Sequence, residues 1–311
     1  MISDTYTLNS KPLISIIMNC FNGDKYLSYS LESIQKQTYQ NWELIFWDNF
    51  STDNSKQIFK SFNDKRFHYY HANEHTTLSK ARNLALDKCN GDFIAFLDVD
   101  DWWSLNKLEL QIELFADPSI QLVYGNFLVN NFKNKSVIYG IPARKINPNK
   151  KAIMYDFDLP SGHIVDYLIK EYVVGMMTIM IRKEIFLNYK YKFNENVNEL
   201  CDLDLVLKIS SKFKFDCCNK IIAHKRLHGD NTFNKDKEKI LKQYTKIYNY
   251  LYNKPNTFNR TSVNFFKNKI LYESLIYNLN KYSIIKSIYI FLKLKFNYKF
   301  KFIKLIYLKI I

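Results

Sequence analysis

The sequence predicts an α/β protein with a doubly wound, mostly parallel sheet that has helices on both faces, followed by a mostly helical C-terminal extension. Three observations lead to this prediction. Short apolar runs alternate with amphipathic stretches of about 10 to 14 residues as far as residue 125. Apolar residues then follow a helical period from about residue 236 to 292, with few turn signals. With 311 residues, 47% of them hydrophobic, the chain can bury a large core.

Five apolar segments in the first part of the chain are predicted to be strands: 13–18, 42–47, 66–70, 93–97 and 120–124. Strand, helix, strand repetition at this spacing indicates parallel strands joined by crossover helices. In such sheets ligands bind at the carboxyl ends of the strands. Polar and acidic residues follow three of these strands, at 19–22, 48–53 and 98–101. We therefore expect the functional site at this edge.

The alternation is looser from residue 126 to 235. We expect a strand at 176–182, a helix at 202–212 and a pair of short strands within 213–225.

The last 31 residues, 281–311, hold eight lysines and no acidic residue, interleaved with Ile, Leu, Phe and Tyr. The second half of this tail fits a strand or a helix, and we favour a helix. A formal net charge of +15 calls for an anionic partner. The tail either binds anionic lipid, which we favour, or packs on the rest of the chain with its lysine stems covering apolar surface.

Five cysteines lie in apolar surroundings without CxxC spacing, which favours a reducing compartment over a disulfide or zinc framework. The first residues, MISDTYTLNSKP, lack the basic and apolar regions of a signal peptide, and no apolar run approaches about 18 residues. We therefore expect a cytoplasmic protein that is neither secreted nor membrane-spanning.

One apolar strand ends in three carboxylates, those of Asp98, Asp100 and Asp101. Carboxylates packed this closely repel one another unless a cation lies among them, and hard oxygen ligands suit Mn²⁺ or Mg²⁺. The alternative is that Asp101 caps a helix beginning near Trp102 while the other two are solvated. These residues alone do not separate the two interpretations.

Together with its neighbours, this cluster resembles the family 2 glycosyltransferases of the GT-A fold, of the bacterial surface-polysaccharide type. Four segments match in the order of the family: Ser15 to Asn22, Trp42 to Ser55, Ala81 to Asn83 and Asp98 to Asp101. A fifth match joins Asp202-Leu203-Asp204-Leu205 to the downstream stretch Arg226 to Asn231. The resemblance covers residues 12 to about 235. It implies a nucleotide-sugar-binding half at 1–125 and an acceptor-binding half with the catalytic base at 126–235. The basic, aromatic, mostly helical extension at 236–311 lies beyond the resemblance.

The resemblance implies a nucleotide site. Asp48 is expected to read the nucleobase edge, and the alternative is a turn aspartate that accepts backbone N–H groups. Asp53 is expected to cap its helix. Arg82 is expected to reach the nucleotide or its phosphates, unless it forms a surface ion pair. Asn22 helps to shape the same pocket, or serves only its turn, and Asp98 flanks the ribose.

The resemblance also implies a metal and a base. Asp100 and His228 are expected to hold the metal, with Asp101 and Arg226 supporting them.

Asp202 matches the general base that takes the proton from the acceptor hydroxyl, with Asp204 supporting it. The alternative is that Asp202 only begins a helix and that the helix dipole stabilises Asp204.

The implied reaction is a metal-assisted single displacement with inversion at the anomeric carbon. The donor is a nucleotide diphosphate sugar, with UDP favoured, and the acceptor is a hydroxyl on a lipid-linked or surface glycan. The enzyme is then peripheral on the inner face of the cell membrane. Asn19, Asn49, Phe50 and Cys201 depart from the family pattern, with Phe50 standing where the family has glycine. The Phe50 and Cys201 changes bear on the choice of donor sugar and acceptor.

Two rival functions fit less well. A nucleotidyltransferase acting on a sugar phosphate normally has a basic, glycine-rich loop after the first strand, and residues 19–25 hold one glycine and one lysine. A nucleic-acid-binding protein would explain the positive charge, but an acidic pocket repels phosphate. We therefore expect no nucleic acid partner.

Overall fold

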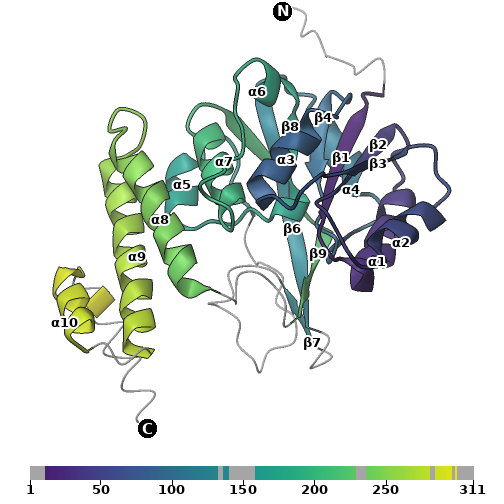
Figure 1. Cartoon of the computed structure of the whole chain (residues 1–311). Helices are drawn as coiled ribbons and strands as arrows, with labels where there is room; N and C mark the ends of the chain where they lie inside the picture. The colour runs from purple at the N-terminus through teal and green to yellow at the C-terminus, as the bar shows by residue number, and fades with distance from the viewer. Residues whose placement is uncertain are drawn as a thin grey trace, which may run out of the picture. The chain divides into compact units, whose positions relative to one another are not determined.

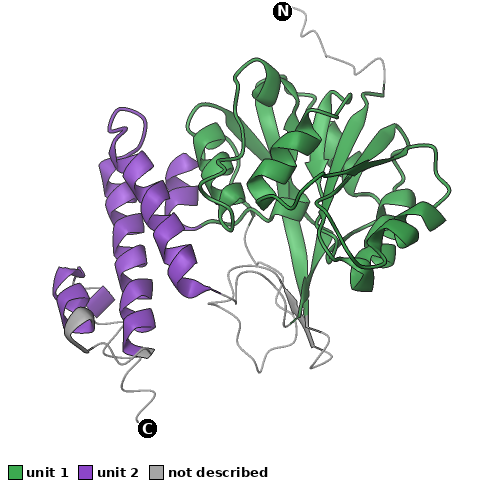
Figure 2. Ribbon diagram, viewed as in Figure 1, with its two compact units in different colours: residues 1–164, 172–229 green, residues 165–171, 230–311 purple. Residues whose placement is uncertain are grey.

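The structure, a computed structural model, describes residues 11–131, 136–139, 158–228, 236–280, 284–295 and 298–299. The chain forms two compact units (Figure 2). Unit 1 comprises residues 1–164 and 172–229, and unit 2 comprises residues 165–171 and 230–311.

Unit 1 is built on one mixed sheet. Its strands are β1 (Ile14–Cys20), β2 (Trp42–Asp48), β3 (Phe67–His71), β4 (Phe93–Phe96), β5 (Trp102–Trp103), β6 (Ile120–Asn131), β7 (Ser136–Tyr139), β8 (Met180–Arg182) and β9 (Lys214–Leu227). They lie in the order β3-β2-β1-β4-β8-β6-β9-β5, with β7 paired to β6. Strands β1 to β4 are mutually parallel, as predicted, and so are β6 and β9. The sheet as a whole is mixed, because β8 pairs antiparallel with β4 and β6, β5 with β9, and β7 with β6. Both predicted halves of the domain contribute strands to it (Figure 1).

Helices cover both faces of this sheet because side chains alternate along each strand. The helices are α1 (Asp24–Gln35), α2 (Ser55–Ser61), α3 (Leu78–Leu86), α4 (Lys107–Leu114), α6 (Glu184–Leu187) and α7 (Cys201–Ser210). Ile14, Ile16 and Met18 of β1 share one buried core with Leu31 of α1 and Leu108 of α4. Helix α3 contacts β1 and β2. The helices thus leave the carboxyl ends of the strands to the loops.

Three sequence expectations need correction. Only Met180–Arg182 of the predicted strand 176–182 is a strand, because 176–178 form a 3₁₀ turn. The predicted pair of short strands within 213–225 is wrong, since β9 is one continuous strand. Its pairing with β6 skips Asn219 and Lys220, a polar irregularity that mimics a turn in the sequence. Trp102 begins β5 and not a helix, so the helix-cap interpretation of Asp101 is also wrong.

Unit 1 buries one lysine in its core. Lys107, the first residue of α4, is fully buried, and its Nζ has no hydrogen-bond partner in the part of the chain that the structure describes. The ammonium lies 4.0 Å from the ring centroid of Trp103. Burial lowers the pKa of Lys107 well below its usual range. The buried amine therefore costs stability at neutral pH.

We expect Lys107→Met to raise the free energy of unfolding by about 1–3 kcal/mol, because a thioether of similar length needs no partner. The stability difference between Lys107→Met and the original chain is expected to shrink as pH rises. Burying Lys107 costs stability only while the lysine of the unfolded chain is protonated, and that cost disappears as pH reaches the pKa of a solvated lysine. Urea unfolding at pH 7 and 10 measures both effects. Lys60→Met, at an exposed position, is the control, and an unchanged or lower stability of Lys107→Met contradicts the argument.

Unit 2 is helical, as predicted for the C-terminal extension. It contains α5 (Val165–Lys170), α8 (Lys237–Tyr252), α9 (Arg260–Asn280) and α10 (Ile284–Lys293). The Asp236 side chain accepts the Lys239 N–H at the start of α8, and Leu275, Ile290 and Leu294 join α9 to α10. Most of the second half of the tail lies outside the described residues. Among the described helices, none combines the length and the apolarity that crossing a membrane requires.

Candidate active site

The loop after β2 is held by Asp48. This residue is 1% exposed, and its Oδ1 accepts the Ser51 N–H (2.8 Å) while its Oδ2 accepts the Tyr69 hydroxyl. Both carboxylate oxygens therefore already have partners inside the protein, which agrees with the turn aspartate considered as the alternative. The nucleobase contact of Asp48 stays a prediction.

The loop after β1 is fastened to the same turn. Asn22 N–H donates to Ser51 Oγ (3.0 Å), and the Asn22 side-chain oxygen accepts the Thr52 N–H (2.8 Å). Asn22 adopts a φ of +51°, a left-handed conformation that asparagine tolerates. It is thus a turn residue exposed at the edge where the site was expected.

Asp53 joins two helices. Its Oδ2 accepts the N–H of Asp24 at the start of α1 (2.9 Å), and its Oδ1 accepts the N–H of Ser55 at the start of α2 (3.0 Å). The predicted capping role of Asp53 therefore agrees with the geometry, and one carboxylate serves both helix starts.

Phe50 departs from ordinary backbone geometry. Its φ is +74°, a left-handed value that is an outlier for a bulky residue and costs on the order of 1 kcal/mol. Its side chain is nevertheless 42% exposed, and its ring lies 5.8 Å from the ring of His71. The one signal in the sequence is that Phe50 stands where the family that the sequence resembles has glycine, the residue that adopts such a φ without strain.

The acidic loop after β4 is tightly organised. Ser30 Oγ of α1 lies 2.7 Å from the Val99 carbonyl oxygen and 2.6 Å from that of Asp101, so its single hydroxyl proton is shared between the two carbonyls. The Asp101 carboxylate is buried and accepts the Arg226 N–H (2.9 Å). Asp101 therefore anchors the loop, while its supporting role at a metal site stays a prediction.

Strand pairing brings distant residues to this loop. Trp102 and Trp103 of β5 pair antiparallel with His224 and Ala223 of β9. The segment before β5 consequently runs beside the segment after β9. His228 Nε2 thereby reaches Asp100 Oδ2 at 2.8 Å, and the two predicted metal ligands are brought together although 128 residues separate them.

The Arg226 side chain packs against three aromatic rings and also contacts the acidic loop. Its guanidinium carbon lies 4.7 Å from the ring centroid of Tyr26, 5.4 Å from that of Tyr29 and 4.8 Å from that of Trp102. Its Nε donates to the Asp100 carbonyl (3.1 Å). These contacts of Arg226 position the loop, and its role in supporting a metal site stays a prediction. The neighbouring residues 229–231 lie outside the described part of the chain.

Arg82 connects the acidic loop to the predicted base. The residue is 4% exposed and forms an ion pair with Asp98, which agrees with the ion-pair alternative except that the guanidinium is buried. The expected contact of Arg82 with the nucleotide stays a prediction. Its Nη2 donates to Asp98 Oδ1 (2.9 Å) and its Nη1 to Cys201 Sγ (2.9 Å). Asp98 keeps 39% of its side chain exposed. Asp98 is thus a partly accessible carboxylate that the buried guanidinium of Arg82 holds in place.

Asp202 lies in the first turn of α7, half-buried, next to Cys201. Burial raises the pKa of its carboxyl, although the charges of Arg82 and Lys225 oppose this rise. A raised pKa suits a general base. Asp204, also in the first turn, is buried and forms an ion pair with Lys208 one turn later. Both residues of this ion pair, Asp204 and Lys208, lie in α7.

Lys225 is a charged residue that the sequence did not single out. Its positive charge lowers the pKa of both Asp101 and Asp202 against the larger effect of burial. The charge of Lys225 therefore acts on both the acidic loop and the predicted base. Lysine at a strand position carries no signal in the sequence, and only the folded structure brings its charge close enough to act on both carboxyls.

A divalent metal would have two protein ligands here, the Asp100 carboxylate and the His228 imidazole. Burial, followed by the nearby charge of Asp98, raises the pKa of Asp100, so a cation is favourable at this position. Within the described residues, no group of three or more His, Cys, Asp or Glu side chains is arranged to hold an ion. The donor set therefore fits a metal whose remaining ligands are substrate oxygens or water.

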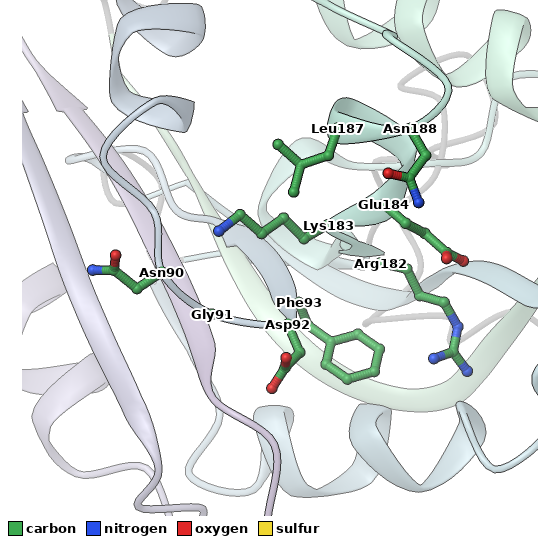
Figure 3. Close-up of a pocket in the computed structure, with 9 residues that line it drawn as sticks. All are labelled: Asn90, Gly91, Asp92, Phe93, Arg182, Lys183, Glu184, Leu187 and Asn188. Atoms are coloured by element: carbon green, nitrogen blue, oxygen red, sulfur yellow. The ribbon is translucent and has the colours of Figure 1, made fainter.

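A hollow of about 410 Å³ lies away from these residues, at the amino end of β4 (Figure 3). Its lining residues are Asn90, Gly91, Asp92, Phe93, Arg182, Lys183, Glu184, Leu187 and Asn188. The two cations among them have partners, because Lys183 Nζ donates to the Cys89 carbonyl (2.6 Å) and Arg182 Nη2 to the Phe115 carbonyl (2.8 Å). This hollow therefore lacks free cations for a ligand.

Comparison with known proteins identifies relatives of this chain. The family model for "Glycosyl transferase family 2" matches residues 15–170. The UDP-Glc:alpha-D-GlcNAc-diphosphoundecaprenol beta-1,3-glucosyltransferase WfgD of Escherichia coli is 35% identical over 183 residues, which are 58% of this chain and 64% of that protein. The putative teichuronic acid biosynthesis glycosyltransferase TuaG of Bacillus subtilis is 30% identical over 57% of this chain and 64% of its own length. The chain thus matches less than two thirds of either relative.

Two solved structures share the fold. TarS 1-349 of S. aureus, in complex with UDP-GlcNAc, superposes with a TM-score of 0.63 at 16% identity and covers 87% of this chain and 75% of its own. The mannosyltransferase PcManGT from Pyrobaculum calidifontis, in complex with GDP-Man and Mn²⁺, superposes with a TM-score of 0.61 at 11% identity and covers 97% and 82%. At these identities the likeness concerns the fold, which confirms the GT-A prediction.

Proposed function

The chain belongs to glycosyl transferase family 2, and from this premise we propose that it is an inverting glycosyltransferase that moves a sugar from a UDP-sugar to an acceptor hydroxyl. One observation carries the proposal. Arg82 bonds Asp98 of the acidic loop, and its charge acts on Asp202 of α7, so a nucleotide-side carboxylate and a candidate base flank one buried cation.

Asp202 takes the proton from the acceptor hydroxyl as that oxygen attacks the anomeric carbon of the donor sugar. The bond between the sugar and the diphosphate breaks in the same step, and the nucleoside diphosphate leaves from the opposite face. A half-buried carboxylate with a raised pKa holds this proton better than a solvated one. Arg82 keeps Asp98 in place, while Asp101 and Arg226 hold the acidic loop.

Asp100 and His228 would hold a Mn²⁺ or Mg²⁺ ion, which supplies positive charge against the departing diphosphate when it is bound. A solved structure of the same fold that contains Mn²⁺ supports this cofactor. UDP is proposed as the nucleotide because a relative is named for UDP-Glc and a structure of the same fold holds UDP-GlcNAc. The name of the same relative supports an acceptor on a lipid diphosphate, within surface-polysaccharide synthesis.

The test of this function is metal-dependent release of UDP from a panel of UDP-sugars, with a GlcNAc-diphosphate lipid as acceptor and mass spectrometry of the product. We expect one donor to be turned over with Mn²⁺ or Mg²⁺ and not with EDTA. An α-linked donor should give a β-linked product, because a single displacement inverts the anomeric carbon. Retention of configuration, or no turnover of any nucleotide sugar in the panel, would refute the proposal.

We also propose a peripheral position on the inner face of the cell membrane, which the proposed acceptor and the basic tail support. Ile288, Tyr289 and Leu292 of α10 are 55%, 58% and 67% exposed, and residues 281–311 contain no acidic side chain. Lysines beside exposed apolar side chains match an anionic lipid interface.

We expect removal of residues 281–311 to abolish sedimentation with phosphatidylglycerol vesicles while UDP binding is kept. The variant with Ile288, Tyr289 and Leu292 all changed to serine keeps the lysines and is expected to weaken sedimentation, because it loses the apolar contacts. Phosphatidylcholine vesicles are the control for charge. Unchanged binding of the truncated chain would leave packing on the protein as the role of the tail.

A further inference from the structure

Phe50 lies in a turn that is closed by hydrogen bonds of other residues, and its ring remains partly exposed. Asp48 closes the turn through the Ser51 N–H, and Asn49 fastens it by donating from Nδ2 to the Thr76 carbonyl (2.8 Å) and accepting the Thr76 hydroxyl (2.9 Å). A glycine would adopt the φ of +74° without strain. The phenylalanine therefore strains the turn while burying only part of its ring.

Residues held in strained backbone conformations such as this one cluster at active sites and ligand contacts. Phe50 follows β2, and Phe21, which is 48% exposed and lies 4.0 Å from the His75 ring, follows the neighbouring strand β1. β4, which leads into Asp98, is the other neighbour of β1. Two exposed aromatic residues thus stand on the same sheet edge as the acidic loop. Such rings offer flat apolar faces, and a nucleobase is the flat part of the proposed donor.

We propose that Phe50 is a contact residue for the donor nucleobase, at a position where the family it resembles has glycine. The assignment rests on the proposed function, because it takes the donor to be a nucleoside diphosphate sugar. The ring supplies stacking area at the edge of the site, and the turn held by Asp48 and Asn49 presents it.

The test compares UDP with inorganic diphosphate, which lacks the nucleobase, by calorimetry with Mg²⁺. We expect Phe50→Ala and Phe50→Gly to weaken UDP binding by about 5- to 50-fold, as loss of a base-stacking ring does. Binding of diphosphate is expected to change less than about twofold, and Phe50→Tyr, which keeps the ring, should bind UDP within about twofold of the original chain. Phe50→Gly is also expected to raise Tm by about 2–4 °C because it relieves the turn.

Two results would overturn the assignment of Phe50 alone: unchanged UDP affinity in both the alanine and the glycine variants, or an equal loss of UDP and diphosphate affinity. The second result would show that the ring supports the site as a whole. Failure of the unaltered chain to bind UDP would overturn the proposed UDP donor together with this assignment. A higher Tm of Phe50→Gly shows that weakened binding does not come from unfolding.

Discussion

Replacing Asp202 with asparagine is expected to lower kcat for sugar transfer by about 10²- to 10⁴-fold, the usual contribution of a general base. The amide has nearly the shape of the carboxylate but cannot accept the proton of the acceptor hydroxyl. UDP binding should change little, because the nucleotide-side residues lie in other loops. Steady-state rates with saturating donor and acceptor, together with calorimetry of UDP, measure the two effects separately.

The pH dependence of the unaltered enzyme provides a second readout. Burial raises the pKa of Asp202, with Arg82 acting against it, so kcat should fall as pH drops through that raised value. Because the pKa of Asp202 is raised in the folded state, the protonated carboxyl adds stability at low pH. This added stability is lost as pH rises through the folded-state pKa. At neutral pH the asparagine variant should therefore be no less stable than the original chain.

The matched control is Asp87→Asn, an exposed carboxylate at the end of α3, which should leave the rate and the pH profile unchanged. If Asp202→Asn keeps more than about a tenth of kcat, the general base lies elsewhere.

Asp100→Asn is expected to lower the metal-dependent rate by about 100-fold or more and to raise the Mn²⁺ concentration that gives half-maximal activity. A neutral amide is a weaker ligand than a carboxylate, and it gives His228 a poorer partner than the bond at 2.8 Å. A Mn²⁺ titration of initial rates checks both effects. The stability of the variant should not fall, because burial and Asp98 disfavour the charged form of Asp100.

For this variant Asp117→Asn is the control, since Asp117 is an exposed carboxylate in the turn after α4. An Asp100→Asn protein with an unchanged Mn²⁺ requirement would show that Asp100 does not bind the metal. Loss of rate without any shift in the Mn²⁺ requirement would instead assign Asp100 to substrate binding.

The parts of the fold that were predicted well depend on local patterns. β1, β2, β3 and β4 begin and end close to the expected positions because each is a short apolar run bounded by polar turn residues. Asn22 and Asp98 lie in the loops that follow β1 and β4, and Asp48 is the last residue of β2. All three are at one edge of the sheet because parallel strands end there. Helical spacing likewise indicated α7 and the C-terminal helices.

The errors concern segments whose conformation depends on distant partners. β9 remains one strand across Asn219 and Lys220 because β6 pairs with it on both sides of the irregularity. β5 contains only Trp102 and Trp103, and it exists because β9 lies beside it. No local pattern indicates either arrangement, since in both cases the stabilising hydrogen bonds come from strands far along the chain.

The sequence by itself determined the fold class, the family resemblance and the types of residue at the candidate site, because strand periodicity and motif order are local properties. Only the tertiary structure decided how those residues meet. The pairing of β5 with β9 joins Asp100 to His228, Arg82 joins Asp98 to Cys201 beside Asp202, and Asp48 is occupied inside its own turn. The contacts of Asp100 with His228 and of Arg82 with Cys201 join segments more than a hundred residues apart. They depend on strand register and burial, which arise only when such distant segments pack together.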